Sequence, residues 1–259
     1  MIVADLHVHT THSDGTLTLE TLPEAAREAG VDVVAVTDHD RLHPDLQTPV
    51  AVVGDVTVVH GIELRVDSPA GHVDLLGYGA RRTDPLVAEL DRLQENRVER
   101  ARRIVDCVED RLGVSLDVAL EPGVGRPHIA QAIADSEADY GYDDAFAELI
   151  GDDCPCYVAR EIPDFETGRD LLADACGLVG LAHPLRYDDP VAALDLTASL
   201  DAVERWYPYG RDVDTRPVEQ AIERHGLVPT GGSDAHGETL GAAGLDADAY
   251  QHFRSHTRL

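Results

Sequence analysis

The chain has 259 residues, with 49 acidic and 21 basic side chains and a formal net charge of −28, and every basic side chain is an arginine. This length suits one large α/β domain that carries an inserted subdomain, and so negative a surface argues against binding double-stranded nucleic acid through basic patches. No apolar run reaches the length of a membrane span, and no signal peptide precedes the first apolar run, so we expect a cytoplasmic protein with no membrane partner.

Strands and helices alternate at both ends of the chain, which indicates an α/β fold. The run Val31–Val36 is apolar apart from Asp32, as expected for a strand that is covered on both faces. Thr18 is expected to cap the first helix and Gly30 to end it. In chain order we expect a strand over 2–8, a helix over 17–29, a strand over 31–36, one or two strands within 49–64 broken at Gly54-Asp55, a strand over 73–78, and then strands over 178–182, 202–203 and 227–230 with helices over 191–200 and 217–225.

The middle of the chain has a different pattern. Apolar residues recur at helical spacing from Leu86 to Leu112, which predicts one long amphipathic helix. Further helices are expected over 127–134 and 143–150, and no strong strand precedes the short run 156–158. We therefore predict a helical subdomain over residues 83–170, inserted into a domain formed by residues 1–82 and 171–259.

Two compositional features remain. The four cysteines, Cys107, Cys154, Cys156 and Cys176, are expected to be reduced and structural or incidental, and a soft-metal or redox role for Cys154 and Cys156 is the weaker alternative. The acidic residues are spread along the whole chain, which we interpret as a halophilic adaptation to a salt-rich cytoplasm.

The first apolar run carries the first candidate site. His7 and His9 are two residues apart, and a strand places such residues on the same face. With Asp14 a few residues later, two imidazoles and a carboxylate form the start of a site for a divalent metal. For two histidines alone, chance exposure near the N-terminus is an equally good interpretation.

Recurrence of such clusters favours the metal site. Polar groups follow or open one apolar run after another, and ligands at the carboxyl ends of successive parallel strands are typical of an α/β-barrel active site. The clusters are Thr37-Asp38-His39-Asp40, Gly61-Ile62-Glu63-Leu64, His72-Val73-Asp74, Ala182-His183-Pro184 and Gly232-Ser233-Asp234-Ala235-His236.

These motifs resemble the PHP (polymerase and histidinol phosphatase) family. Within it, the chain is similar to the metal-dependent phosphoesterases that act on nucleoside 3′,5′-bisphosphates and short oligoribonucleotides. The matching stretches, in the family's order, are DLHVHTTHSDG, AVTDHD, GIEL, HVDLLGYG, GRPHIA, LAHPLRY and GGSDAH. The resemblance implies a distorted (β/α)7-type PHP barrel with an inserted helical subdomain.

The resemblance also implies a catalytic centre with two or three divalent metal ions. His7, His9, Glu63 and Asp234 would hold the first, Glu63, Asp74 and His183 the second, and Asp14, His39 and His236 the third. Ligand sets that mix imidazole and carboxylate suit manganese, zinc or iron better than calcium or magnesium.

One position departs from the family pattern. The family has a histidine three residues before the glycine of the LLGY motif, where this chain has Asp74, and His72 lies two residues earlier. We expect Asp74 to be the ligand because the register of that motif fixes its place, and His72 is the alternative. A charged ligand in place of a neutral one would alter metal affinity or choice at the second site.

Substrate contacts are expected in the inserted subdomain. Arg126 and His128 lie at a predicted helix start, where backbone N–H groups attract anions. Arg97 and Arg100 on the long helix are weaker candidates, since surface arginines also pair with nearby glutamates. The aromatic run 206–209 follows a late strand and would stack on a nucleobase or, alternatively, anchor a loop.

We therefore expect a phosphoester hydrolase in which a hydroxide activated by the metals attacks phosphorus. The expected partner is a small phosphorylated substrate, a nucleotide or short RNA, and not double-stranded nucleic acid. Histidinol-phosphate phosphatase is the alternative activity. A non-catalytic metal-binding PHP module is the alternative of another class.

Overall fold

The computed structural model describes residues 1–258, and contacts among them divide the chain into two units. The first unit comprises Met1–Val87 and Ile162–Leu259, and the second comprises Ala88–Glu161. Among the described residues, no helix combines the length and the apolar character that a membrane span requires.

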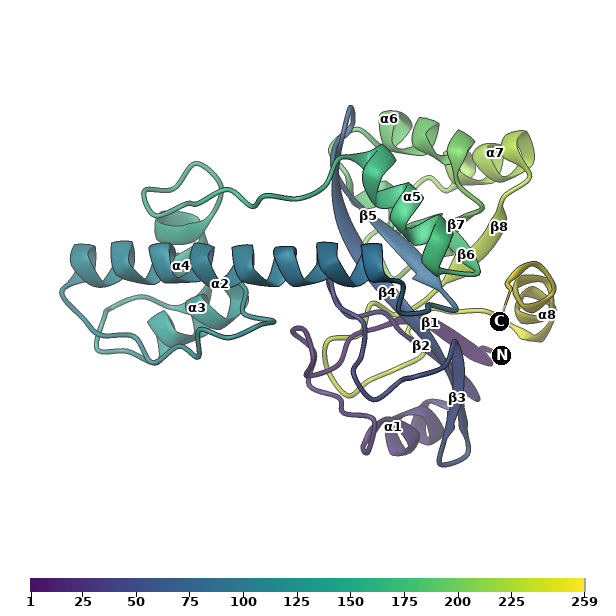
Figure 1. Ribbon diagram of the computed structural model, residues 1–259, viewed down its shortest axis with the longest axis horizontal. Coiled ribbons are helices and arrows are strands. Elements are labelled where there is room, and N and C mark those ends of the chain that lie inside the picture. Colours follow the sequence, from purple (N-terminus) through teal and green to yellow (C-terminus); the bar gives the residue numbers. More distant parts are fainter. Residues whose placement is uncertain (259) are drawn as a thin grey trace. The chain divides into compact units, whose positions relative to one another are not determined.

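The first unit is built on one curled sheet (Figure 1). Its strands lie in the order β1-β2-β4-β5-β6-β7-β8, with β3 paired to β4 off this path. The neighbours of β5 run antiparallel to it, whereas β1, β2, β4 and β6, β7, β8 form parallel ladders. The strands are β1 (Ala4–Val8), β2 (Val33–Val36), β3 (Val50–Val53), β4 (Val56–Ser68), β5 (Gly71–Tyr78), β6 (Leu178–Leu181), β7 (Ala202–Trp206) and β8 (Val228–Gly231).

The two ends of the sheet meet. Backbone hydrogen bonds join His7 and His9 at the end of β1 to Ala235 just beyond β8. The result is a curled half-barrel, which confirms the α/β class of the barrel that the motifs implied. Helices lie outside it, with α1 beside β2 and β3 and with α5, α6 and α7 beside β5 to β8 (Figure 1). They are α1 (Leu22–Ala29), α5 (Phe165–Ala175), α6 (Pro190–Asp195), α7 (Arg216–His225) and α8 (Ala247–His256), with 3₁₀ turns at Pro184–Arg186 and Leu196–Ser199.

Two apolar clusters hold the first unit together. One fills the half-barrel, where Tyr78 of β5 and Phe253 of α8 pack edge to face with ring centroids 5.3 Å apart. The other lies between α1 and β2, where buried Leu22 and Ala26 meet Val34 and Val36. Burial on both faces explains why β2 is apolar throughout.

The second unit is helical. It contains most of α2 (Asp84–Leu112), α3 (Arg126–Ala134), α4 (Tyr142–Ala145) and a π-helical turn at Phe146–Ile150. Its core joins one face of α2, including Ile104 and Val108, to Ile129 and Ile133 of α3.

The expectation that all four cysteines are reduced was wrong for two of them. Cys107 of α2 forms a disulfide with Cys156, whereas Cys154 and Cys176 are free. The partners are 49 residues apart in sequence. Sequence spacing drew attention to Cys154 and Cys156, but only the helical packing brings Cys107 next to one of them.

Several boundaries also differ from expectation. Helix α1 begins at Leu22 and not at Leu17, because Thr18 and Thr21 bond to each other in a turn and leave the helix start uncapped by a side chain. Residues 156–158 form no strand. Helices α5 and α8 were not expected, although each has an aspartate N-cap, Asp164 and Asp246.

Candidate active site

His7 on β1 and His9 just after it are fully buried, and both rings approach the same two carboxylates. The Nδ1 atom of His7 lies 3.1 Å from Glu204 of β7. Its Nε2 atom therefore faces the other way, 3.4 Å from a carboxylate oxygen of Glu63 and 3.4 Å from one of Asp234. The Nε2 atom of His9 lies 3.1 Å from the same Asp234 oxygen. The strand thus presents two imidazole nitrogens to two carboxylates.

Nine residues expected as ligands from sequence gather here, all in the first unit. They form three overlapping groups, and within each group the potential ligand atoms lie within 4.8 Å of one another. Glu63 belongs to two groups and His9 to two. The groups are His7, His9, Glu63 and Asp234; Glu63, Asp74 and His183; and His9, Asp14, His39 and His236.

The direction of β5 explains where its ligand lies. Strand β5 runs antiparallel to both β4 and β6. Its first residues therefore lie at the same end of the sheet as Glu63 on β4 and His183 just after β6. Asp74 is buried there with its Oδ2 3.8 Å from Nε2 of His183. His72, by contrast, is about half exposed and lies nearest Asp67, so the structure brings Asp74 and not His72 to the cluster.

The backbone at two ligands is unusual. His183 has φ 27° and Asp234 has φ 52°, a region that non-glycine residues rarely adopt and that concentrates at functional sites. Gly232 lies against β1, where an added Cβ would come within 2.4 Å of the Cβ of His7. Only glycine lets the end of β8 approach His7 so closely.

Charge complementarity dominates the electrostatics. Burial disfavours charge on Glu63, yet His39 and His7 hold its pKa well below the usual value. Burial likewise opposes protonation of His39, but the Glu63 carboxylate outweighs it and raises the pKa of His39 to about 9. The carboxylates thus attract positive charge, which protons supply here and which divalent ions would supply by displacing them.

Two buried carboxylates brace the loops that carry the ligands. Asp38 accepts hydrogen bonds from the hydroxyls of Thr10 and Ser13, between His9 and Asp14. Asp5 accepts from the backbone and hydroxyl of Ser233, next to Asp234. Such bonds fix the orientation of the groups they support.

This geometry coincides with clear similarity to known proteins. The PHP domain model matches residues 5–147. A phosphoribosyl 1,2-cyclic phosphate 1,2-diphosphodiesterase from Eggerthella lenta is 31% identical over 254 residues, covering 92% of this chain and 95% of that protein.

The chain belongs to the PHP domain family. It is accordingly a metal-dependent phosphoester hydrolase. A 3′,5′-nucleoside bisphosphate phosphatase from Chromobacterium violaceum is also similar, 26% identical with 90% of this chain and 86% of that protein covered. A 5′-3′ exoribonuclease of Escherichia coli is 28% identical, with 72% and 67% covered.

Solved structures agree with the PHP fold. A protein from Bifidobacterium adolescentis described as a metal-dependent phosphoesterase superposes with a TM-score of 0.82 at 23% identity, over 99% of this chain and 96% of that one. An amidohydrolase from Chromobacterium violaceum, solved with sulfate and without metal, gives 0.77 at 24% identity, over 98% and 96%.

The expected substrate contacts of this PHP chain all lie in the second unit. Arg126 pairs with Asp152 at 3.0 Å, and its guanidinium lies over the rings of Phe146 and Tyr157. The ring of His128 accepts a hydrogen bond from the backbone of Gly125, which caps α3.

The other two expected contacts lie on α2. Arg100 is buried and donates to the carbonyl of Val158 at 2.6 Å. Burial and the neighbouring Arg126 lower its pKa to about 10. Arg97 is also buried and reaches toward the carbonyl of Val124. These arginines therefore gather positive charge within the second unit.

Sequence reasoning missed four residues near the ligands. Glu204 holds His7, Arg65 holds Asp74, and Arg186 and Tyr207 both bond to Oδ2 of Asp234 at 3.0 and 2.8 Å. Arg186 stood inside a quoted motif and Tyr207 inside the aromatic run. Glu204 and Arg65 lie on strands and outside the candidate ligand clusters. The only sequence signal for them is the alternation of side chains along a strand, which would place them on the face that points into the sheet's interior.

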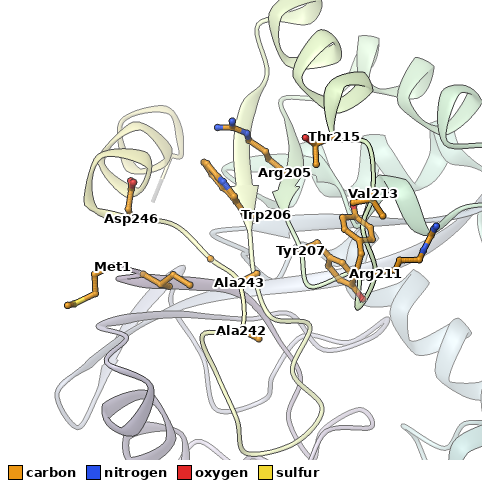
Figure 2. A pocket seen from close by; sticks show the side chains of 13 residues that line it. Met1, Arg205, Trp206, Tyr207, Arg211, Val213, Thr215, Ala242, Ala243 and Asp246 are labelled. Carbon is orange, nitrogen blue, oxygen red and sulfur yellow. The ribbon is translucent and has the colours of Figure 1, made fainter.

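The first unit also contains a groove, which is shown in Figure 2. It encloses about 570 Å³ and is lined by aromatic and basic side chains, including Trp206, Tyr207, Tyr209 and Arg211. Tyr207 joins the groove to the ligand cluster, because it is one of the residues that line the groove and its hydroxyl donates to Asp234.

Proposed function

We propose that this PHP enzyme hydrolyses phosphate esters of small nucleotides, 3′,5′-bisphosphonucleosides or short oligoribonucleotides. The observation that carries the proposal is the buried, converging ligand set, in which the Nε2 atom of His7 has no hydrogen-bond partner and faces two carboxylates. A buried polar atom without a partner is costly unless something binds it.

The residues present fit divalent ions. His7 and His9 contribute imidazoles and Glu63 and Asp234 contribute carboxylates, a mixture that suits manganese, zinc or iron. Such ions would lower the pKa of bound water and neutralise charge on the phosphate. The two groups that contain His7 and His236 have the larger donor sets, and we expect metal there first.

The chain's own residues would orient the phosphate. Arg186 is half exposed and anchored by Asp234 and by the hydroxyl of Tyr207, so its planar fork is held in place with N–H groups left for a phosphate oxygen. His236 at the rim is 41% exposed, so this end of the ligand set is open to solvent, and water there can supply the proton for the leaving oxygen.

The groove supports a nucleoside as leaving group. Aromatic rings stack on any base, and Trp206, Tyr207 and Tyr209 line one groove, from which the hydroxyl of Tyr207 reaches Asp234. We propose that the base lies there, and that Arg126, His128, Arg97 and Arg100 of the second unit add contacts to phosphate. Histidinol phosphate remains the alternative substrate.

A second candidate substrate comes from the Eggerthella lenta relative. That protein is named for a cyclic phosphodiester of ribose, and it is more similar in sequence than the named bisphosphate phosphatase, at 31% against 26% identity. A cyclic ribose phosphate presents the same charge to the ligands and lacks a base for the groove.

The test is a hydrolysis screen with chelator-stripped protein, with and without manganese or zinc. Inorganic phosphate is measured for the phosphomonoesters, and chromatography detects the nucleotides or ring-opened monoester that the phosphodiesters release. Substrates are a 3′,5′-bisphosphonucleoside, a short oligoribonucleotide, a cyclic ribose phosphate and histidinol phosphate. The proposal expects metal-dependent release from the first two. Preference for histidinol phosphate or the cyclic ester would replace the substrate assignment, and full activity without metal would refute the proposal.

A further inference from the structure

Asp74 does not stand free at the group that it shares with Glu63 and His183. Arg65 lies directly opposite it on β4, and such cross-strand partners share a face of the sheet. The guanidinium grips both carboxylate oxygens, with Nε 2.8 Å from Oδ1 and Nη2 2.8 Å from Oδ2. Asp74 is only 2% exposed, so this fork is its main compensation for burial.

Asp234 provides a contrast in the same site. Its arginine, Arg186, contacts the outer oxygen Oδ2, while Oδ1 remains turned toward His7 and His9. At Asp74 the oxygen that faces His183 is Oδ2, and Arg65 binds that same atom. One carboxylate thus keeps an oxygen for the cluster, and the other has both oxygens engaged by a cation.

We infer that Arg65 takes the place of a tightly bound metal ion at the Glu63, Asp74 and His183 group, so that this chain retains metal in its other two groups alone. A divalent ion bound to Asp74 would lie close to the guanidinium and be repelled by it. The positive charge of Arg65 also offsets the negative charge of Glu63, which lies on the same face of β4. The inference rests on the metal binding proposed above.

The experiment measures metal content. Protein stripped with chelator is reloaded with excess manganese, desalted and analysed for metal per chain by plasma mass spectrometry. The variants are Arg65→Met, which removes the cation, and Arg65→Lys, which keeps a charge without the fork. Arg169→Met is the matched control, since Arg169 forms a surface pair with Asp170 in the same unit.

We expect about two manganese ions per chain in the wild type, Arg65→Lys and Arg169→Met, and about three in Arg65→Met, because Asp74 then needs another cation. Manganese should also raise the melting temperature of Arg65→Met more than that of the wild type. Far-UV circular dichroism checks that each variant is folded.

The outcomes separate the two claims. About three ions in the wild type would overturn the inference and leave the proposed function intact, and this holds even if Arg65→Met does not fold. About two ions in a folded Arg65→Met would also overturn it. No retained metal in any protein would instead overturn the proposed function, and the inference with it.

Discussion

His7 shows how a single contact with a buried carboxylate decides which ring nitrogen faces the site. Glu204 is fully buried, lies 3.1 Å from Nδ1 of His7 and also accepts the backbone N–H of His183 at 2.7 Å. A carboxylate at Nδ1 fixes the tautomer in which Nε2 carries the lone pair, the form that a metal requires.

Glu204→Gln should therefore weaken metal binding at the His7 group by about ten- to a hundred-fold, because the amide holds the ring without the negative charge. A competition titration with a chromophoric chelator measures this directly. Glu219→Gln, which loosens a surface pair with Arg205, is the control and should leave affinity unchanged. Equal affinities in both variants would mean that Glu204 serves the backbone of His183 alone.

Buried His60 is expected to make the free energy of unfolding decrease at acidic pH. It is 1% exposed, and burial together with nearby His43 and Arg82 lowers its pKa to about 4, although Asp38 partly opposes this shift. Its folded pKa lies below the unfolded value, so its contribution is complete near neutral pH and is lost as pH falls from about 6.5 toward 4.

Between pH 7 and 5 this residue should cost the wild type about 2 kcal/mol of unfolding free energy. His60→Gln cannot be protonated and should lose correspondingly less over the same interval, as measured by urea unfolding at both pH values. Parallel losses in the two proteins would show that His60 is not the group responsible.

At the scale of elements, the sequence predicted the parts that a local pattern specifies. The strands that became β2, β5, β6, β7 and β8 and the helix α2 were expected within a few residues, because apolar runs and helical spacing depend on neighbours in sequence. The nine ligands were expected because they follow or open these strands in family motifs. The contacts made by Arg65 and Glu204 depend on strand pairing, which no local pattern encodes.

The disulfide is such a long-range feature, and it ties α2 to the segment that ends the second unit. Cys107→Ser should lower the stability of the protein by about 2–4 kcal/mol, because the unfolded chain regains the freedom of a 49-residue loop. Urea unfolding with and without dithiothreitol is the measurement. Reductant should destabilise the wild type to the level of the variant and leave the variant unaffected; a wild type indifferent to reductant would contradict the pairing.

At the scale of the whole molecule, the expected contribution of the second unit to substrate binding is testable through Arg126. If it grips phosphate, Arg126→Ala should lower kcat/KM by about ten- to a hundred-fold with metal content unchanged, and lysine should restore activity only in part. Its contacts with Asp152, Phe146 and Tyr157 give it a local structural role as well. If Arg126→Ala lowers the melting temperature and leaves kcat/KM unaltered, Arg126 has only the structural role.

The net charge of −28 makes a prediction for the entire surface. Raising the salt concentration from about 0.1 to 1 M shortens the screening length from about 10 to 3 Å and should relieve self-repulsion. The melting temperature should therefore rise steadily with potassium chloride. A flat or falling curve would mean that local ion pairs, and not net repulsion, govern the response to salt.

The groove of Figure 2 has a practical consequence for watching this enzyme at work. Trp206 is the only tryptophan of the chain, and it lines the groove with the guanidinium carbon of Arg205 4.7 Å from its ring centroid. Indole fluorescence responds to nearby charge and to stacked rings. In this protein all of the indole fluorescence comes from a residue that lines the groove. The native protein thus contains a built-in fluorophore, and occupancy of the groove can be followed in real time without any label.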